Sequence, residues 1–247
     1  MSEKDRLYRD DSIQADEFVF DQRVVRVFPD MIRRSVPGYG VIVPSIALLA
    51  RRHAQAGTNI YDLGCSLGAV TFAIMDAIPA GGNTVIAVDN SAEMISGLRR
   101  KATERSGEEG PPDPRLKIVE ADILDTGIEN ASVVVMNFTL QFIDPEKRDE
   151  LLQGIAVGLR PGGVLVLSEK VRFVDASEEK LQSAWHLDFK RAQGYSELEI
   201  ARKRDALEKT LKPETVEAHL NRLRQAGFAS AYRWFQCFNF AALVAFR

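Results

Sequence analysis

The chain has 247 residues, of which 45% are hydrophobic and 27% are charged, with 32 Lys and Arg against 35 Asp and Glu. This composition excludes disordered, collagen-like and coiled-coil proteins, and a net charge of -3 provides no general attraction to nucleic acid, so we expect no direct nucleic-acid binding. The opening residues lack the apolar core of a secretory signal and no apolar run is long enough for a membrane span, which predicts a cytoplasmic protein without membrane contact. The two cysteines, Cys65 and Cys237, belong to no metal-ligand motif, so we expect free thiols and no metal.

The first predicted element is residues 18–40, a helical segment that combines apolar residues with arginines and ends near the turn-forming Pro37-Gly38. Late in the chain, residues 175–211 form a second helical insertion. Neither segment fits a simple alternation of strands and helices. Both would reach the carboxyl ends of the predicted strands, where open α/β sheets bind ligands, so both are candidates for a lid. Extra packing or a dimer surface is the alternative interpretation.

Five short runs of apolar and β-branched residues have the length of buried strands. They are residues 58–64, 83–90, 115–122, 131–138 and 163–169. Strands that alternate with helical patterns predict a mostly parallel sheet with helices on both faces. Aromatic-rich runs at residues 232–235 and 238–246 predict an antiparallel hairpin that closes the edge of the sheet. We therefore expect one α/β domain over residues 1–247.

The helices between the strands carry their own start and stop signals. After the second strand, Asn90 is predicted to cap a helix whose Glu93 reaches back to the cap. A helix from Pro145 is predicted to stop at Pro161-Gly162-Gly163. Residues 106–114, with the sequence SGEEGPPDP, are typical of an exposed connection between elements.

The segment DLGCSLG, residues 62–68, lies at a predicted strand-to-helix turn. Its glycines let a ligand approach the backbone and the helix N-terminus offers free N–H groups, which fits a nucleoside-binding loop. The same residues resemble a nicotinamide dinucleotide fingerprint without its middle glycine, and a plain tight turn accounts for one or two of the glycines. Asp62 favours a cationic ligand such as S-adenosylmethionine, because its charge would lie close to where a dinucleotide needs its pyrophosphate.

Polar residues end three of the predicted strands. Asp89 ends the second strand, where a carboxylate accepts hydrogen bonds from both ribose hydroxyls. Asp122 follows the third strand and fits an adenine amino group, and Asn137 follows the fourth and fits the polar tail of a ligand. A helix cap or an Asx turn explains each residue equally well by spacing alone.

These features resemble the class I S-adenosylmethionine-dependent methyltransferase fold, a Rossmann-like, mostly parallel sheet with a C-terminal antiparallel hairpin. Longer blocks are similar to one family within it, the carboxy-S-adenosylmethionine synthases, over about residues 18–246. The blocks are VFPDMIRRSVPGY (27–39), YDLGCSLGA (61–69), IENASVVVMNFTLQF (128–142), LSEK (167–170), DFKRAQGYSELEI (188–200) and WFQCFNF (234–240). The N-terminal tail and residues 106–114 depart from the resemblance, and we expect neither to take part in the chemistry.

The resemblance implies a homodimeric enzyme that carboxylates the methyl group of S-adenosylmethionine instead of transferring it. Prephenate would be the carboxyl source and phenylpyruvate the second product. Hydroxide lost from prephenate would take the methyl proton, and the resulting ylide would attack carbon dioxide, so no protein base is required. The product, carboxy-S-adenosylmethionine, would serve a tRNA carboxymethyltransferase that builds the 5-oxyacetyl group on a wobble uridine.

The resemblance also implies which residues bind the adenosyl compound. Arg204 has the catalytic role, because it would reach the new carboxylate from the neighbouring subunit and grip it through two parallel hydrogen bonds. By composition alone, Arg202-Lys203-Arg204 is more typical of a solvated basic face. The other implied cofactor-binding residues are Tyr39, Gly64, Cys65, Ser66, Asp89, Asn90, Asp122, Ile123 and Asn137.

Three other functions remain open at this point. A conventional methyltransferase shares the same pocket, although Asn137-Phe138-Thr139-Leu140 lacks the NPPY or DPPY motif of many amino-directed enzymes. A non-catalytic scaffold would hold S-adenosylmethionine and recruit a tRNA-modifying partner. A nicotinamide oxidoreductase is the third alternative.

Overall fold

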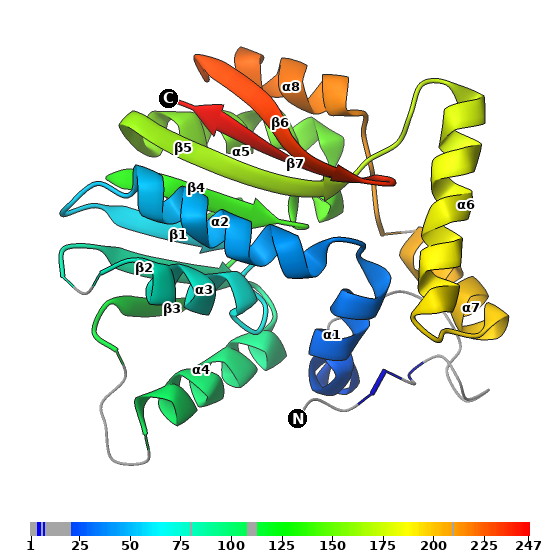
Figure 1. The fold of residues 1–247 in the computed structure, drawn as a ribbon. Coiled ribbons are helices and arrows are strands. Elements are labelled where there is room, and N and C mark those ends of the chain that lie inside the picture. Colours follow the sequence, from blue (N-terminus) through cyan, green and yellow to red (C-terminus); the bar gives the residue numbers. More distant parts are fainter. Residues whose placement is uncertain (1–3, 6, 8–20, 80, 108–112, 209) are drawn as a thin grey trace.

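The structure, a computed structural model, describes residues 4, 5, 7, 21–79, 81–107, 113–208 and 210–247. These residues form one seven-stranded sheet in the order β3-β2-β1-β4-β5-β7-β6 (Figure 1). Strands β1 to β5 are parallel, whereas β7 runs antiparallel to both β5 and β6, so the predicted fold with its closing hairpin is confirmed. The strands are β1 Asn59–Leu63, β2 Thr84–Asp89, β3 Leu116–Glu120, β4 Ala131–Asn137, β5 Leu159–Lys170, β6 Ser230–Cys237 and β7 Phe240–Phe246.

Helices cover both faces of the sheet, as the alternation of elements predicts. On β4, Val133 and Val135 face a core shared with α2 and α3, whereas Val134 and Met136 face a core shared with α5 and α8. This two-sided burial explains why the central strands are almost wholly apolar. The helices are α1 Gln22–Ser35, α2 Tyr39–His53, α3 Ala69–Ala77, α4 Ala92–Ser106, α5 Pro145–Gly158, α6 Ala176–Ala192, α7 Glu197–Glu208, α8 Val216–Gln225 and the short 3-10 helix η1 Leu140–Phe142.

The start of α4 differs from the prediction. Ser91 caps the helix instead of Asn90, because its hydroxyl accepts a hydrogen bond from the backbone N–H of Met94 at 3.2 Å. Glu93 contacts that hydroxyl at 3.4 Å and does not reach back to Asn90 as predicted. The carboxylate of Asp89 accepts the backbone N–H of Ser91 at 3.0 Å, which turns the chain before the helix begins. Asn90 is thereby left exposed at the end of β2.

The boundary between α5 and β5 was also predicted wrongly. The helix begins at Pro145 as expected, but it ends at Gly158 and the strand starts at Leu159, so Pro161-Gly162-Gly163 lies inside the strand. Leu159 pairs with Ala131, whereas Val164 pairs with Val133, and the register shifts between them. The proline and glycines are accommodated in this irregularity and do not end the helix.

Three helices lie beyond the carboxyl ends of the parallel strands, on the right of Figure 1. Residues 18–40 supply α1, the turn at Gly38 and the start of α2, with residues 18–20 outside the described residues. Residues 175–211 supply α6 and α7. The predicted loop at 106–114 falls largely on residues 108–112, which also lie outside the described part. No helix in the described part of the chain is long and apolar enough to cross a membrane.

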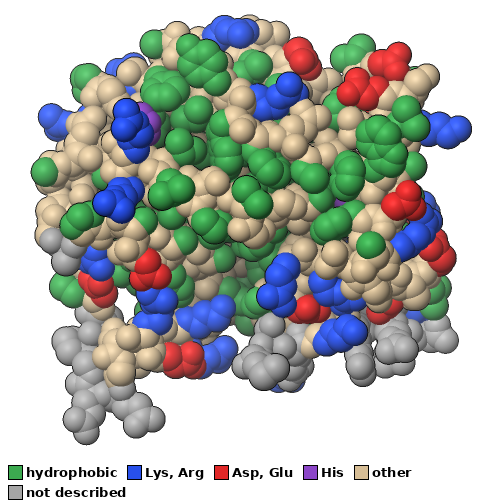
Figure 2. Space-filling view, in the orientation of Figure 1, with side chains coloured by type: hydrophobic (Ala, Val, Ile, Leu, Met, Phe, Trp, Pro, Cys, Tyr) green, Lys and Arg blue, Asp and Glu red, His purple; other side chains and the backbone are tan. Residues whose placement is uncertain are grey.

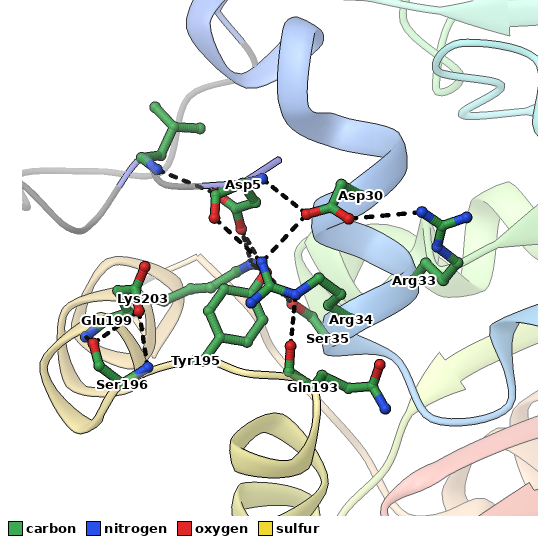
Figure 3. Close-up of polar contacts among 11 residues, drawn as sticks. Asp5, Asp30, Arg33, Arg34, Ser35, Gln193, Tyr195, Ser196, Glu199 and Lys203 are labelled. Atoms are coloured by element: carbon green, nitrogen blue, oxygen red, sulfur yellow. Dashed lines mark hydrogen bonds and ion pairs between the residues drawn. The ribbon is translucent and has the colours of Figure 1, made fainter. Parts of the chain in front are cut away.

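A buried polar network joins α1 to the segment between α6 and α7 (Figure 3). Arg34 donates to the backbone carbonyl of Gln193 at 2.8 Å, and its guanidinium lies 4.0 Å from the centre of the Tyr195 ring. The Tyr195 hydroxyl donates to Asp5 at 2.5 Å, and Lys203 pairs with the same carboxylate at 3.3 Å. The two helical insertions therefore pack as one unit, and Asp5 contacts residues of both.

Candidate active site

The turn between β1 and α3 brings backbone N–H groups to the carboxyl edge of the sheet. The N–H groups of Gly64 and Cys65 both donate to the carbonyl of Val88, at 2.8 and 2.9 Å, which ties the turn to β2. Gly64 has a φ of +78°, and a Cβ atom at this position would lie 2.3 Å from the hydroxyl oxygen of Thr139. Both the backbone conformation and the available space therefore require glycine here.

Asp89 lies beside this turn at the end of β2. Its two carboxylate oxygens accept the backbone N–H groups of Ser66, at 2.8 Å, and Ser91, at 3.0 Å. Burial raises the pKa of Asp89, and these two hydrogen bonds oppose the increase. Each carboxylate oxygen has a second acceptor position, so Asp89 is able to accept two ribose hydroxyls while it holds the turn.

Asp122 and Ile123 lie in the turn after β3. The Asp122 carboxylate accepts the backbone N–H of Leu124 at 2.9 Å, which is the Asx turn that the spacing also allowed. One carboxylate oxygen is engaged in this way, and no described residue donates to the other. Ile123 is 6% exposed and packs in the core beneath the strand ends.

Asn137 ends β4, next to β1 in the sheet, and its side-chain oxygen is buried without a hydrogen-bond partner among the described residues. Leaving such a group unpaired costs on the order of 1–3 kcal/mol. An ammonium group, such as the one on the amino-acid tail of S-adenosylmethionine, would supply the missing donor. Tyr39, the first residue of α2, lies close by, with its ring centre 6.4 Å from that of Phe138. The hydrogen-bond acceptors at these strand ends therefore fit an adenosyl amino acid.

Asp62 lies near the end of β1, just before the glycine turn, and is buried there. Its carboxylate is 1% exposed beneath the turn and accepts the Thr71 hydroxyl at 2.5 Å. Burial and the charge of the neighbouring Asp89 raise the pKa of Asp62 to about 6, against the hydrogen bonds from Thr71. The carboxylate braces α3 against β1, and its charge also acts on Tyr39 at the strand ends. The argument from its charge against a pyrophosphate stays a prediction.

The side chain of Cys65 faces the core. It is 4% exposed, and burial raises the pKa of its thiol, so the thiol stays protonated at neutral pH. Cys65 and Cys237 are both free, as expected. Among the described residues, no group of three side chains is arranged to hold a metal ion.

Arg204 stands apart from the strand ends. It lies on α7 with a side chain that is 54% exposed, and it pairs with Asp205 at 3.4 Å. Its charge also acts on Lys190 of α6. The structure thus gathers the other predicted residues around the ends of β1 to β4 and the start of α2, and leaves Arg204 on the outer helical unit of its own chain.

Sequence reasoning missed several polar residues at the carboxyl ends of the parallel strands. Ser168 of β5 pairs in register with Asn137, and Lys170 follows it on the same face of the strand. Their positions at the end of a predicted strand are the signal that would have found them. Lys190 of α6 is 7% exposed, but a lysine in a charged amphipathic helix carries no sequence signal of burial.

Glu169 lies on the opposite face of β5 and provides a test of pH dependence. Burial raises its pKa to about 8, against the opposing charge of Arg148 and the backbone N–H groups of Gln141 and Leu140. The neutral form of Glu169 is therefore favoured in the folded protein. The contribution of Glu169 to the free energy of unfolding is fully present below pH 4.5 and is lost as the pH rises through about 8. Urea unfolding at pH 5, 7 and 9 should show that Glu169→Gln loses less stability with rising pH than the parent chain, by about 4 kcal/mol, because each pKa unit between the folded and unfolded states contributes about 1.4 kcal/mol. The exposed Glu146→Gln should follow the parent chain, and an identical decline in both variants would contradict the assignment.

A parallel sheet covered on both faces, an antiparallel final strand, a glycine turn after β1 and an acidic residue ending β2 define the class I S-adenosylmethionine-dependent methyltransferase fold. A family model described as a methyltransferase domain matches residues 60–163. The fold is similar to a Methanococcus maripaludis methyltransferase structure, with a TM-score of 0.58, 18% identity, and coverage of 96% of this chain and 97% of that one. It is also similar to human N-acetylserotonin methyltransferase in complex with SAM, with a TM-score of 0.58, 14% identity, and coverage of 92% and 55%.

Curated relatives narrow this class to one family. Carboxy-S-adenosyl-L-methionine synthase from Pseudomonas putida strain KT2440 is 54% identical over 241 residues, which cover 98% of this chain and 97% of that protein. The protein of the same name from Citrifermentans bemidjiense is 53% identical over 231 residues, covering 94% and 93%. The chain belongs to the carboxy-S-adenosyl-L-methionine synthase family.

Proposed function

We propose that the chain converts S-adenosylmethionine and prephenate into carboxy-S-adenosylmethionine and phenylpyruvate. The observation that carries the proposal is the identity of 54% to a synthase of this name over 98% of the chain. The geometry of the strand ends adds support, because an unpaired buried amide oxygen and a carboxylate with free acceptor positions fit the two ends of an adenosyl amino acid. S-adenosylmethionine is here a substrate that is consumed.

The proposed binding residues divide the ligand between them. Asp89 accepts hydrogen bonds from the ribose hydroxyls, and Asn137 accepts one from the ammonium of the amino-acid tail. The backbone at Gly64, Cys65 and Ser66 passes close beneath the ligand. The remaining members of the proposed set are Tyr39, which covers the sulfonium end, together with Asn90, Asp122 and Ile123, which flank the adenine.

The proposed reaction balances without a protein base. Prephenate loses carbon dioxide and hydroxide as its ring becomes aromatic, which yields phenylpyruvate. The hydroxide removes a proton from the methyl group on the positive sulfur and becomes water. The carbanion left on the methyl carbon then attacks carbon dioxide and forms the new carbon–carbon bond. Water must be excluded while carbon dioxide is held, so we assign the unit of α1, α6 and α7 as a lid.

Arg204 is proposed to select the carboxylated product. Replacing Arg204 with alanine should weaken binding of carboxy-S-adenosylmethionine about 10- to 100-fold, because a charge-assisted bond to a carboxylate contributes about 1.5–3 kcal/mol. Binding of S-adenosylmethionine should change less than about twofold, since that ligand lacks the new carboxylate. Titration calorimetry with each compound measures both effects, with Arg202→Ala on the same helix as the control. Equal losses for the two ligands would remove this role.

A homodimer with shared sites is the second part of the proposal for Arg204. Exposed apolar side chains support an interface: Val41 and Leu48 of α2 are 56% and 64% exposed, and hydrophobic side chains spread across this face in Figure 2. If the sites are shared, a dimer of one Arg204→Ala chain and one Gly64→Ala chain regains one working site. In that site the Arg204→Ala chain supplies an intact Gly64 and the Gly64→Ala chain supplies Arg204. A shared site would be contradicted if the protein sediments with the mass of a single chain. It would also be contradicted if co-expression of the two variant chains restores no activity.

The proposed product is an activated carboxymethyl donor. We propose that a tRNA carboxymethyltransferase uses it to build the 5-oxyacetyl group on wobble uridine, in the cytoplasm where tRNA is modified. The link is functional and requires no nucleic-acid contact by this chain.

Mass spectrometry of a reaction mixture tests the proposed function directly. The purified protein is incubated with S-adenosylmethionine, with and without prephenate, and then denatured. A compound that carries one carboxyl group in place of one methyl hydrogen, formed with prephenate and in step with phenylpyruvate, is the expected result. Unchanged S-adenosylmethionine together with methyl transfer to another acceptor would replace the proposal with a conventional methyltransferase.

A further inference from the structure

Lys190 lies on α6 one helical turn after His186, and both side chains are buried at the carboxyl end of the sheet. Lys190 is 7% exposed and His186 is 6% exposed. The His186 ring packs edge-on against Phe240 of β7, with ring centres 4.9 Å apart, and Phe240 packs in the same way against Phe138. Because Phe138 directly follows Asn137, α6 brings Lys190 to the strand ends that hold the proposed ligand.

Several cations converge on Lys190. Burial, together with the charges of Lys203, Lys170 and Arg204, lowers its pKa to about 7. Burial and the charges of Lys190, Lys170 and Lys203 lower the pKa of His186 to about 3, so the imidazole is neutral. Three other cations therefore act on Lys190.

Lys203 and Lys190 differ in how their charges are compensated. Lys203 pairs with Asp5 at 3.3 Å and donates to the Ser35 hydroxyl at 2.8 Å. No hydrogen bond or ion pair reaches the ammonium of Lys190 from any residue in the described part of the chain. A buried charge without a partner is unfavourable, and the neighbouring cations increase the penalty. A bound anion would remove it.

Polar side chains of β5 lie along the same edge. Val164 and Val166 of β5 face the core shared with α2, so strand alternation puts Ser168 and Lys170 on that face as well. Ser168 lies beside Asn137 in the parallel register. The hydroxyl oxygen of Ser168 and the amide oxygen of Asn137 are both buried without a partner among the described residues. The Ser168 hydroxyl thus borders the proposed seat of the amino-acid tail, and Lys170 follows on the same face of the strand.

We propose that Lys190 binds a carboxylate of the second substrate beside the adenosyl compound. The inference rests on the proposed function, because it names the seat of the carboxyl donor at the same site. A fixed cation stabilises a carboxylate that keeps its charge throughout the reaction, whereas it would oppose the loss of one that leaves as carbon dioxide. Lys190 therefore holds the carboxylate that prephenate retains in phenylpyruvate.

The carboxylate on the amino-acid tail of S-adenosylmethionine is the other anion that Lys190 could bind. Binding measurements distinguish this carboxylate from that of prephenate. Titration calorimetry of prephenate uses protein saturated with S-adenosylhomocysteine, which has no methyl group to react. Lys190→Met should weaken prephenate binding at least 30-fold and leave S-adenosylmethionine binding within twofold. Lys190→Arg should restore most of the prephenate affinity, because it returns the charge. Lys180→Met, at an exposed position on the same helix, should match the parent chain.

A second readout depends on the proton carried by Lys190. Anion binding raises the pKa of the buried ammonium, so at pH 8 prephenate binding should take up a substantial fraction of one proton. Calorimetry in buffers with different ionisation enthalpies measures this uptake. It should disappear in Lys190→Met and persist in Lys180→Met, which a merely structural role of Lys190 would not produce.

The outcomes separate the two proposals. Normal prephenate affinity in Lys190→Met, or a loss confined to S-adenosylmethionine, overturns the inference while carboxylation by the parent chain still supports the proposed function. A parent chain that neither binds nor consumes prephenate overturns both.

Discussion

Replacing Gly64 with alanine should weaken S-adenosylmethionine binding at least 100-fold, or ~2.7 kcal/mol. An alanine at a φ of +78° costs about 1–2 kcal/mol, and its Cβ would lie 2.3 Å from the Thr139 hydroxyl oxygen, so the turn must move. That movement displaces the backbone that holds Asp89 through Ser66. Titration calorimetry with S-adenosylmethionine measures the loss.

Gly57→Ala is the matched control for this prediction. Gly57 has a φ of +73°, close to that of Gly64, but nothing lies within 4 Å of a Cβ atom built on it. The control therefore introduces the same backbone strain without the collision and should keep its ligand affinity. If Gly64→Ala also keeps its affinity, the turn does not contact the ligand.

Replacing Arg148 with methionine should lower the free energy of unfolding by about 3–5 kcal/mol, the usual effect of breaking a buried charge network. The Arg148 side chain is 0% exposed and donates to the carbonyls of Ile143, at 2.9 Å, and Lys212, at 2.8 Å. It also pairs with Glu214 at 2.5 Å. Methionine fills similar space but leaves both carbonyls without a donor. Urea unfolding measures the loss.

Arg105→Met separates burial from ion pairing. Arg105 pairs with Asp76 at the same 2.5 Å, but the two side chains are 48% and 62% exposed. Its loss should change the free energy of unfolding by less than about 1 kcal/mol, because solvent screens exposed pairs. Similar losses in the two variants would show that burial of Arg148 does not determine its contribution.

The sheet was predictable because its signals are local. Strand ends came within one or two residues of prediction for β1 to β4, since buried parallel strands are short apolar runs bounded by polar turns. The errors arose where two local signals competed. Asn90 and Ser91 are both good helix caps, and the Asp89 hydrogen bond to the Ser91 N–H favours the second. Pro161-Gly162-Gly163 is a typical helix stop, but the pairing of Leu159 with Ala131 starts the strand before it.

The candidate site also has a part that the sequence predicts and a part that it does not. Gly64, Asp89 and Asn137 stand next to strand ends, so a parallel sheet brings them together whatever the rest of the chain does. The burial of Asp62 depends on α3, which packs Thr71 against it, and no pattern around Asp62 indicates that contact. Asp5 lies in a tail set aside as divergent, yet it pairs with Lys203 at 3.3 Å.

The sequence by itself determined the sheet, the glycine turn and the acidic residue that ends β2. The spacing of apolar residues in a strand and the conformational freedom of a glycine both depend on only a few neighbouring residues. Only the tertiary structure decided which charges are buried and which are compensated. Lys190 and the exposed Lys180 look alike in the sequence of α6, but the packing of α6 over the strand ends desolvates one and not the other. Desolvation and charge clustering depend on contacts between distant segments, and these two effects make Lys190 a candidate for anion binding.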